Sequence, residues 1–280
     1  MSMLRLMGLN HWNGMRCVMK KIIEAIAKNK LSRYSYSKIS TYDDCHYKFK
    51  LKYIDRLKVE KLPIRALEKG KYIHKLIESY FTLRLLGDTI NMKTVEEMSI
   101  EDYPHNFPEE VSRCISIFHS LINSDRFQKL FPVDVCVYPE VEMEIPDIAV
   151  AYIDAYVEVS SDNSVILYDW KTGKTTKYNG RQLAFYFLLL NHLRPEIKTV
   201  TIRYYLIEHD EILEHTIDEN SDIVLETKGW IIKTLEEIDK DTLYTKNMNN
   251  CRFCEYKDYC QKETSEILRE YHNKINKEKR

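Results

Sequence analysis

Two short segments of alternating apolar and polar residues constrain the fold more than any other feature of the sequence. AYIDAYVEV spans residues 151–159, and VILYDWK at 165–171 follows it after a short polar stretch. Alternation with a period of two predicts half-buried β-strands, and a short polar connection between them predicts an antiparallel hairpin. Two further segments, at 137–145 and 199–207, have the same strand character. The sequence therefore predicts a sheet that contains this hairpin.

Helices are expected before and between these strands. Residues 66–86 have helical periodicity and are followed by a glycine, which commonly ends a helix. RQLAFYFLLLNHL at 181–193 is apolar nearly all round, which predicts a helix buried inside the fold. A third helix is expected over 38–57. The order of helices, strands, helix and strand predicts an α/β fold with a helical insertion at about 88–135.

Composition and charge limit the class of protein. The chain is 44% hydrophobic and 30% charged, and its net charge of -1 argues against coating nucleic acid through bulk charge. No stretch approaches the ~20 apolar residues of a membrane helix. The N-terminus lacks the apolar region of a secretory signal, although a cleaved transit peptide is an alternative. We expect a cytoplasmic protein of a bacterium or a phage-infected host, with no membrane partner. It should comprise an N-terminal extension (1–31), a single domain (32–262) and a charged C-terminal helix (263–280).

The segment VILYDWKTGKTTKYNG at 165–180 allows two interpretations. Gly173-Lys174-Thr175 resembles the end of a phosphate-binding P-loop, but such a loop has a glycine five positions before Gly173, where Tyr168 stands. Asp169-Trp170-Lys171 instead resembles the core of a metal-dependent nuclease. By itself an aspartate two residues before a lysine is most often a surface ion pair, so its neighbours decide.

The first strand of the hairpin supplies a second carboxylate. If the connection places Ser161 opposite Ser164, then Asp154 lies opposite Lys171, and Asp169 lies diagonally, all on one face of the sheet. Two carboxylates and an ammonium group in this arrangement suit a hard divalent cation and an attacking water. The hairpin therefore predicts a site for phosphodiester chemistry.

Six elements in order resemble the RecB-like branch of the PD-(D/E)XK nuclease superfamily. They are SYSKISTYDDCHYKFKLKYI, GKYIHKLIESY, YIDAYVEV, ILYDWKTGK, QLAFYFLLL and CRFCEYKDYC. The match is closest to the iron–sulfur members: the CRISPR-associated RecB-like exonucleases, the AddB-type nuclease domain and related phage proteins. The resemblance implies a restriction-endonuclease-like core, with a mixed central sheet flanked by helices and a helical insertion. It also implies a cysteine-cluster cap that joins the N- and C-terminal segments.

The resemblance also implies roles for individual side chains. The Mg²⁺ or Mn²⁺ ligands would be His74, Asp154, Asp169 and the Trp170 carbonyl, Lys171 would be the catalytic lysine, and Gln182 and Tyr186 would position DNA. Two positions depart from the family pattern. Ala151 replaces a usual glycine, and Asp169 stands where many members carry glutamate. Neither departure removes a ligand.

Three of the seven cysteines crowd together near the C-terminus, in Cys251-x₂-Cys254-x₅-Cys260. An odd number of cysteines without a secretory signal argues against a disulfide framework. The resemblance implies that the remote Cys45 joins these three around a 4Fe–4S cluster. Four cysteines also form structural Zn²⁺ sites, and the paired spacing is typical of zinc. Either metal would link distant parts of the chain.

The resemblance therefore implies a Mg²⁺- or Mn²⁺-dependent DNA nuclease, more in keeping with an exonuclease than an endonuclease. Its substrate would be single-stranded DNA or free ends, in recombination, repair, phage DNA processing or CRISPR adaptation. A helicase or a recombination or adaptation protein is the expected partner. Two alternatives remain: a non-catalytic scaffold subunit that binds DNA ends, and a zinc-stapled adaptor. The intact histidine, aspartates and lysine argue against a scaffold, and metal content would identify an adaptor.

Overall fold

The computed structural model describes residues 5–6, 33–59, 63–88, 90–159, 163–173, 179–252 and 254–266. Most of the expected N-terminal extension and the end of the expected C-terminal helix lie outside these residues. The chain divides into two compact units. We call Met1–Tyr36 with Pro63–Ile232 the sheet unit, and Ser37–Leu62 with Lys233–Arg280 the cysteine unit.

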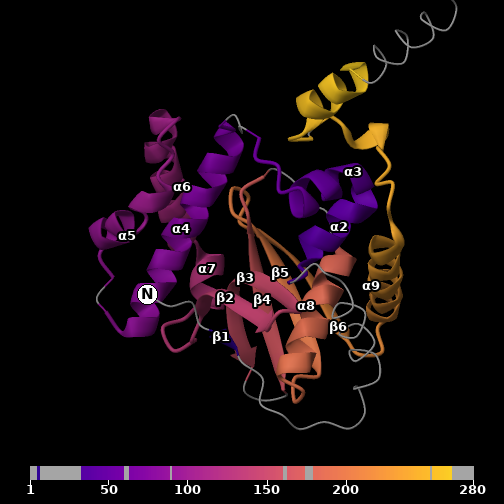
Figure 1. The fold of residues 1–280 in the computed structure, drawn as a ribbon. Coiled ribbons are helices and arrows are strands. Elements are labelled where there is room, and N and C mark those ends of the chain that lie inside the picture. The colour runs from indigo at the N-terminus through magenta and orange to yellow at the C-terminus, as the bar shows by residue number, and fades with distance from the viewer. Residues whose placement is uncertain are drawn as a thin grey trace, which may run out of the picture. The chain divides into compact units, whose positions relative to one another are not determined.

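Five strands and one short strand segment form a mixed sheet in the order β1-β2-β3-β4-β5-β6. They are β1 (Arg5–Leu6), β2 (Tyr138–Ile145), β3 (Ala149–Val159), β4 (Ser164–Lys171), β5 (Thr199–Leu206) and β6 (Glu211–Asp218). The β1–β2 and β4–β5 pairs are parallel, and the other pairs are antiparallel. The prediction of an α/β fold with a mixed sheet flanked by helices is confirmed (Figure 1).

The sheet unit contains a long helix, several short helices between it and β2, and a helix between β4 and β5. They are α4 (Arg65–Leu86), α5 (Met92–Met98), the 3₁₀ turns at Ile100–Asp102 and Pro108–Glu110, α6 (Val111–Ile122), α7 (Asp125–Leu130) and α8 (Gly180–Leu193). Gly87 ends α4 in the left-handed conformation, with φ of 73°, as its position in the sequence predicted. Helix α9 (Asp222–Lys240) follows β6. None of the helices among the described residues is long and apolar enough to cross a membrane.

An aromatic core fixes α4 against one face of the sheet. Phe81 of α4 stacks on Trp170 of β4 with ring centroids 6.2 Å apart, and Phe127 and Phe131 complete the cluster. All four side chains are at most 2% exposed. Because side chains alternate along a strand, the residues on either side of Trp170, which are Asp169 and Lys171, point to the opposite face. Packing of one face therefore dictates which side chains the other face presents.

The predicted hairpin forms, but its register is corrected by two residues. Val159 pairs with Ser164, so the ladder runs to Ala155 paired with Tyr168 instead of following a Ser161–Ser164 pair. Continued by one more residue, this register places Asp154 opposite Asp169 rather than opposite Lys171. A shift of two residues keeps every side chain on its predicted face, because the side-chain period is two.

The helix expected over 38–57 is interrupted. The structure has α2 (Tyr36–Asp44), α3 (His46–Phe49) and a π-helical turn (Lys50–Ile54). The break falls at Cys45, whose extended backbone has φ of -167° and whose Sγ accepts a hydrogen bond from the Lys48 N–H. The helix prediction was wrong here because apolar periodicity does not detect a capping residue in mid-pattern.

Candidate active site

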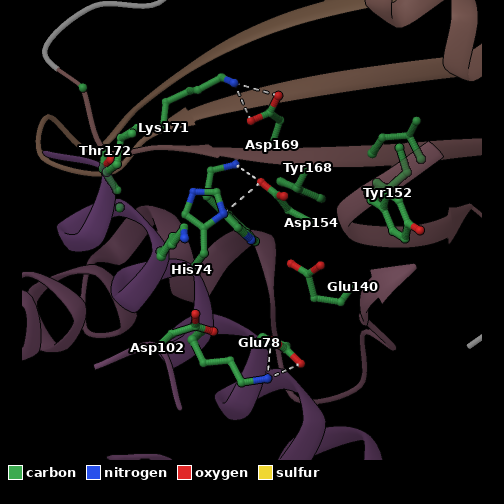
Figure 2. Close-up of a pocket in the computed structure, with 18 of the residues that line it drawn as sticks. His74, Glu78, Asp102, Glu140, Tyr152, Asp154, Tyr168, Asp169, Lys171 and Thr172 are labelled. Carbon is green, nitrogen blue, oxygen red and sulfur yellow. Dashed lines mark hydrogen bonds and ion pairs between the residues drawn. The ribbon is translucent and has the colours of Figure 1, made fainter. Parts of the chain in front are cut away.

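The candidate site lies where two strands of the sheet separate. The β3–β4 ladder ends at Ala155 and Tyr168, after which β3 continues only with β2 and β4 continues only with β5. Asp154 and Asp169 are the first residues past this point. A pocket of ≈840 Å³ opens here, lined by side chains of α4, β2, β3, β4 and α8. Figure 2 shows the two aspartates at its centre.

Each aspartate is held by a specific donor. Asp154 Oδ2 accepts a hydrogen bond from the Trp170 backbone N–H at 2.8 Å. The β3–β4 ladder has ended before this residue and no longer uses that N–H. Lys171 Nζ lies 2.7 and 2.8 Å from the two carboxylate oxygens of Asp169. The same ammonium lies 5.4 Å from the centre of the Tyr204 ring, within range of a cation–π contact. The lysine is thus fixed beside the two carboxylates.

His74 reaches the same point from α4. Its Nδ1 lies 3.5 Å from Asp154 Oδ2, and Figure 2 shows the ring beside that carboxylate. Burial lowers the pKa of the imidazole, but the hydrogen bond and charge of Asp154 outweigh burial, so the pKa is raised. A close crossing positions the helix: a Cβ on Gly70 would lie 3.2 Å from Thr172 Oγ1, at the end of β4.

Gln182 and Tyr186 line the pocket from α8. They are one helical turn apart, and Gln182 Nε2 donates to Tyr186 Oη at 2.6 Å. Asn179 caps the helix by accepting from the Gln182 N–H and also accepts from the Tyr36 hydroxyl, which fixes the start of α8. The structure thus brings together all seven side chains and groups that the sequence assigned to catalysis, metal and DNA.

Three further carboxylates that the sequence analysis did not identify line the pocket: Glu78, Asp102 and Glu140. Glu78 lies one turn beyond His74 on α4, and Glu140 lies on β2 level with Asp154. Glu140 has φ of 46°, an uncommon conformation for a residue other than glycine. Burial and the charges of Asp154 and Glu78 raise its pKa to about 7. The four-residue spacing from His74 was a signal for Glu78, whereas only the β2–β3 register reveals Glu140.

Desolvation and repulsion dominate the electrostatics of the aspartate pair. Burial raises the pKa of Asp169, and the nearby charge of Asp154 raises it further, against the opposing charge of Lys171. Carboxylates crowded in this way are stabilised by a cation placed between them. Two carboxylates and an imidazole are also ligands that Mn²⁺ and Mg²⁺ sites use. In the part of the chain that the structure describes, however, no three His, Cys, Asp or Glu side chains already form a ligand sphere.

The four cysteines singled out in the sequence gather within the cysteine unit. Cys45, Cys251, Cys254 and Cys260 line one cavity of ≈70 Å³, and all four are half-buried free thiols. Asn247 lies between two of them: its N–H is 3.4 Å from Cys45 Sγ, and its carbonyl oxygen is 3.7 Å from Cys251 Sγ. Burial raises the pKa of Cys260, and Cys251 and Cys45 contribute to the rise. The remaining described cysteines, Cys114 and Cys136, lie outside this cavity, and Cys17 falls outside the described residues.

The mixed sheet places the chain in the α/β class, and its sequence identifies the family. Residues 33–261 match the PD-(D/E)XK nuclease superfamily, so the chain belongs to that superfamily. A solved structure from Eubacterium rectale, described as a "putative exonuclease", is similar with a TM-score of 0.50 and 14% identity. That match covers 89% of this chain and 94% of the other, and it shows a shared fold.

A second solved structure, SSO0001, has a TM-score of 0.30 and 16% identity over 75% of this chain and 92% of its own. This likeness is too weak to carry an argument. No curated protein matches the chain in sequence. Membership of the superfamily supports nuclease activity, and nucleases of this superfamily generally use Mg²⁺ or Mn²⁺.

Proposed function

We propose that this chain is a Mg²⁺- or Mn²⁺-dependent deoxyribonuclease that acts as an exonuclease on single strands or free ends. We place it in the RecB-like, iron–sulfur branch of its superfamily, with residues 32–262 as the nuclease and a role in recombination, repair, phage DNA processing or CRISPR adaptation. The observation that carries the proposal is the meeting of Asp154, Asp169, Lys171 and His74 at the strand separation in one open pocket.

The cation would be held by the two aspartates, His74 and the Trp170 carbonyl. When bound, such a cation lowers the pKa of a water and neutralises charge on the scissile phosphate. Every one of these groups lies at one pocket, although Asp169 is turned to Lys171 and Asp154 to the Trp170 N–H. Ligand binding would require Asp169 to exchange one of its two contacts with Lys171 for the cation.

Lys171 would orient the attacking water and stabilise negative charge that develops on the phosphate. Its ammonium is suited to this role because Asp169 and the Tyr204 ring hold it in place at the pocket. Gln182 and Tyr186 would bind the DNA backbone, since their polar atoms already form a pair on the wall of the pocket that α8 contributes. Hydrolysis would then proceed by direct attack of water, without a covalent enzyme intermediate.

The cysteine cavity would hold a 4Fe–4S cluster, with Zn²⁺ as the alternative. Four thiols from two distant segments line one small cavity, and their chemistry suits either metal, although no three of them are already placed as a ligand sphere among the described residues. Metal analysis and the visible absorption of anaerobically purified protein distinguish the two, because a 4Fe–4S cluster absorbs visible light and Zn²⁺ does not. The metal content of the same preparation also tests the alternative of a zinc-stapled adaptor.

The proposal is tested with end-labelled linear and circular single-stranded DNA in the presence of Mn²⁺. Wild-type protein should degrade linear DNA, and Lys171→Ala should lose this activity. Lys93→Ala is the matched control, because Lys93 is also ion-paired within the sheet unit, to Glu97, but lies outside the pocket. It should retain full activity.

Each result has a defined meaning. Cleavage of circular DNA would replace the exonuclease by an endonuclease. An absence of cleavage by wild-type protein with its metal centre intact would favour the non-catalytic scaffold that binds DNA ends. Cleavage that persists in Lys171→Ala would show that the activity comes from another site or from a contaminant.

A further inference from the structure

An exposed aromatic side chain lies on the same strand face as Asp154. Tyr152 of β3 is 50% exposed and lines the same pocket. Among the described aromatic side chains of the sheet unit, it is the one that is exposed. A single exposed apolar residue usually has no functional meaning. Tyr152 differs from such residues in its position in the pocket of the two aspartates.

Tyr152 and Lys171 flank the aspartates on the two separating strands. Tyr152 precedes Asp154 by two residues, which places their side chains on one face about 7 Å apart along the strand. Lys171 follows Asp169 by two residues on the other arm. Figure 2 shows Tyr152 on the far side of Asp154 from Lys171. A strand of DNA that crosses the separation would meet the lysine, the carboxylates and then the tyrosine ring.

The surroundings of Tyr152 suit a nucleobase better than a phosphate. Its cross-strand neighbour on β2 is Glu142, which shares the Arg33 guanidinium with Glu144 at 3.1 and 2.9 Å, so two carboxylates face one positive charge and disfavour a phosphate. The ring itself offers an apolar face on a strand that remains paired with β2 through this region. Its backbone is thus held in place, and the ring would lose little freedom on stacking.

Stacking requires that the base be free of its own neighbours. A phosphate bound at Asp154 has its base about one sugar away, which is on the order of the ~7 Å rise from residue 154 to residue 152 along the strand. In a duplex that base is stacked and paired, so only an unpaired nucleotide presents its face to the tyrosine. Every base has such a face, so the contact would select single strands without selecting sequence.

We propose that Tyr152 is a stacking platform for one unpaired nucleobase next to the scissile phosphate, and that it sets the preference of this site for single-stranded DNA. This inference rests on the proposed nuclease function and adds to it a residue that determines substrate class. The residue positions substrate and takes no part in bond breaking.

The test couples one side chain to one base. Single-stranded oligonucleotides carry a single abasic site at successive positions, and kcat/KM is measured for wild type, Tyr152→Leu, Tyr152→Phe and Tyr152→Trp. Stacking of one base corresponds to a loss of roughly 5- to 150-fold when it is removed. On intact DNA, Tyr152→Leu should lose that factor, while the Phe and Trp variants should stay near wild type because both keep a ring.

The abasic series gives the decisive result. One position should reduce wild-type kcat/KM by the same factor, and Tyr152→Leu should be insensitive to the lesion at that position alone. Leu213→Ala is the control, because Leu213 is an exposed apolar residue of β6 outside the pocket, and it should show the wild-type pattern. Equal thermal unfolding midpoints would show that the variants are folded.

Two outcomes overturn the inference. In the first, Tyr152→Leu responds to every abasic position as wild type does. In the second, Tyr152→Phe loses as much as Tyr152→Leu, which would assign the role to the hydroxyl group. Neither would affect the proposed nuclease function.

A binding readout separates the two claims. With Lys171→Ala protein, an oligonucleotide containing 2-aminopurine should be quenched at one position, and the added Tyr152→Leu change should abolish that quenching. If wild-type protein cleaves no DNA, the nuclease proposal fails, and this measurement still decides the stacking role: quenching that depends on Tyr152 supports it, and quenching that does not overturns it.

Discussion

The crossing of Gly70 over Thr172 predicts that one added methyl group will lower activity without lowering stability. Gly70 lies inside α4, where alanine is favoured over glycine by about 1 kcal/mol. The added Cβ would lie 3.2 Å from Thr172 Oγ1, whereas ordinary contacts begin at 3.4 Å. Gly70→Ala should therefore displace α4 from the end of β4 by a few tenths of an ångström.

The size of the activity loss follows from His74. It lies one turn after Gly70 on the same helical face, so the displacement is carried to its contact with Asp154, which is 3.5 Å at present. A misplacement of 1 Å at an active site can cost about 100-fold. A few tenths of an ångström should therefore lower kcat/KM by roughly 2- to 5-fold. The unfolding free energy should stay equal to that of wild type or rise by up to ~1 kcal/mol.

Gly229 provides the matched control. It also lies inside a helix, α9, but no atom lies within 4 Å of a Cβ placed there. Gly229→Ala should raise the midpoint of thermal unfolding by about 2–4 °C and leave cleavage unchanged. Activity is measured on single-stranded DNA, and stability by chemical and thermal unfolding.

Removal of the opposing oxygen completes the test. The double variant Gly70→Ala/Thr172→Ala should have a kcat/KM close to that of Thr172→Ala alone, because the clashing oxygen is absent. The double variant Gly70→Ala/Thr172→Ser should remain well below Thr172→Ser alone, because serine keeps the oxygen. Wild-type kcat/KM in Gly70→Ala, or a loss that neither partner change alters, would refute the steric argument.

Three further predictions concern the core, a buried charge and the cysteine cavity. Phe81→Ala should lower the unfolding free energy by about 3–5 kcal/mol in denaturant titrations, because Phe81 is buried in the aromatic cluster, whereas Leu86→Ala on the exposed side of the same helix should change it by less than about 0.5 kcal/mol. Burial, and secondarily the charge of Arg56, lowers the pKa of Lys38 from 10.5 to about 8 in the folded protein. Between pH 8 and pH 10.5 the unfolded chain therefore binds a proton that the folded chain has lost. The stability of the wild-type protein should accordingly rise with pH between these two pH values. Lys38→Met should accordingly gain about 1–3 kcal/mol at pH 7 and lose that gain by pH 10.5, and a gain of the same size at both pH values would contradict the assignment. Cys45→Ser should lower both the metal content and the unfolding midpoint, whereas Cys136→Ser, an exposed cysteine outside the cavity, should change neither.

The sequence predicted strands and faces better than it predicted registers. Alternation at 151–159 and 165–171 placed Asp154, Asp169 and Lys171 on one face, and the error of two residues in the register left those faces intact. Loop length could not be deduced from composition, because SSDNS is compatible with more than one pairing. The separation of β3 from β4 was not predictable either, since it depends on which partner each strand retains.

Two of the residues that the sequence analysis missed share one property. Glu140 and Tyr152 matter through their neighbours on adjacent strands or across the pocket, and their own segments look like ordinary alternating strands. The break at Cys45 was missed for the related reason that its capping role depends on local backbone geometry. Motif spacing finds groups that act together along the chain, whereas contacts between distant segments need the fold.

The cysteine unit is assembled from Ser37–Leu62 and Lys233–Arg280, and this division sets an order of events during synthesis. At ~5–20 residues per second, a ribosome takes roughly 10–35 s to make the intervening segment. Throughout that interval the emerging chain holds Cys45 without its three later partners, while the segment that forms the sheet is completed. A chain truncated before Lys233 would therefore contain the sheet segment but only Ser37–Leu62 of the cysteine unit. Acquisition of metal at that cavity would mark a chain as having been translated through Cys260.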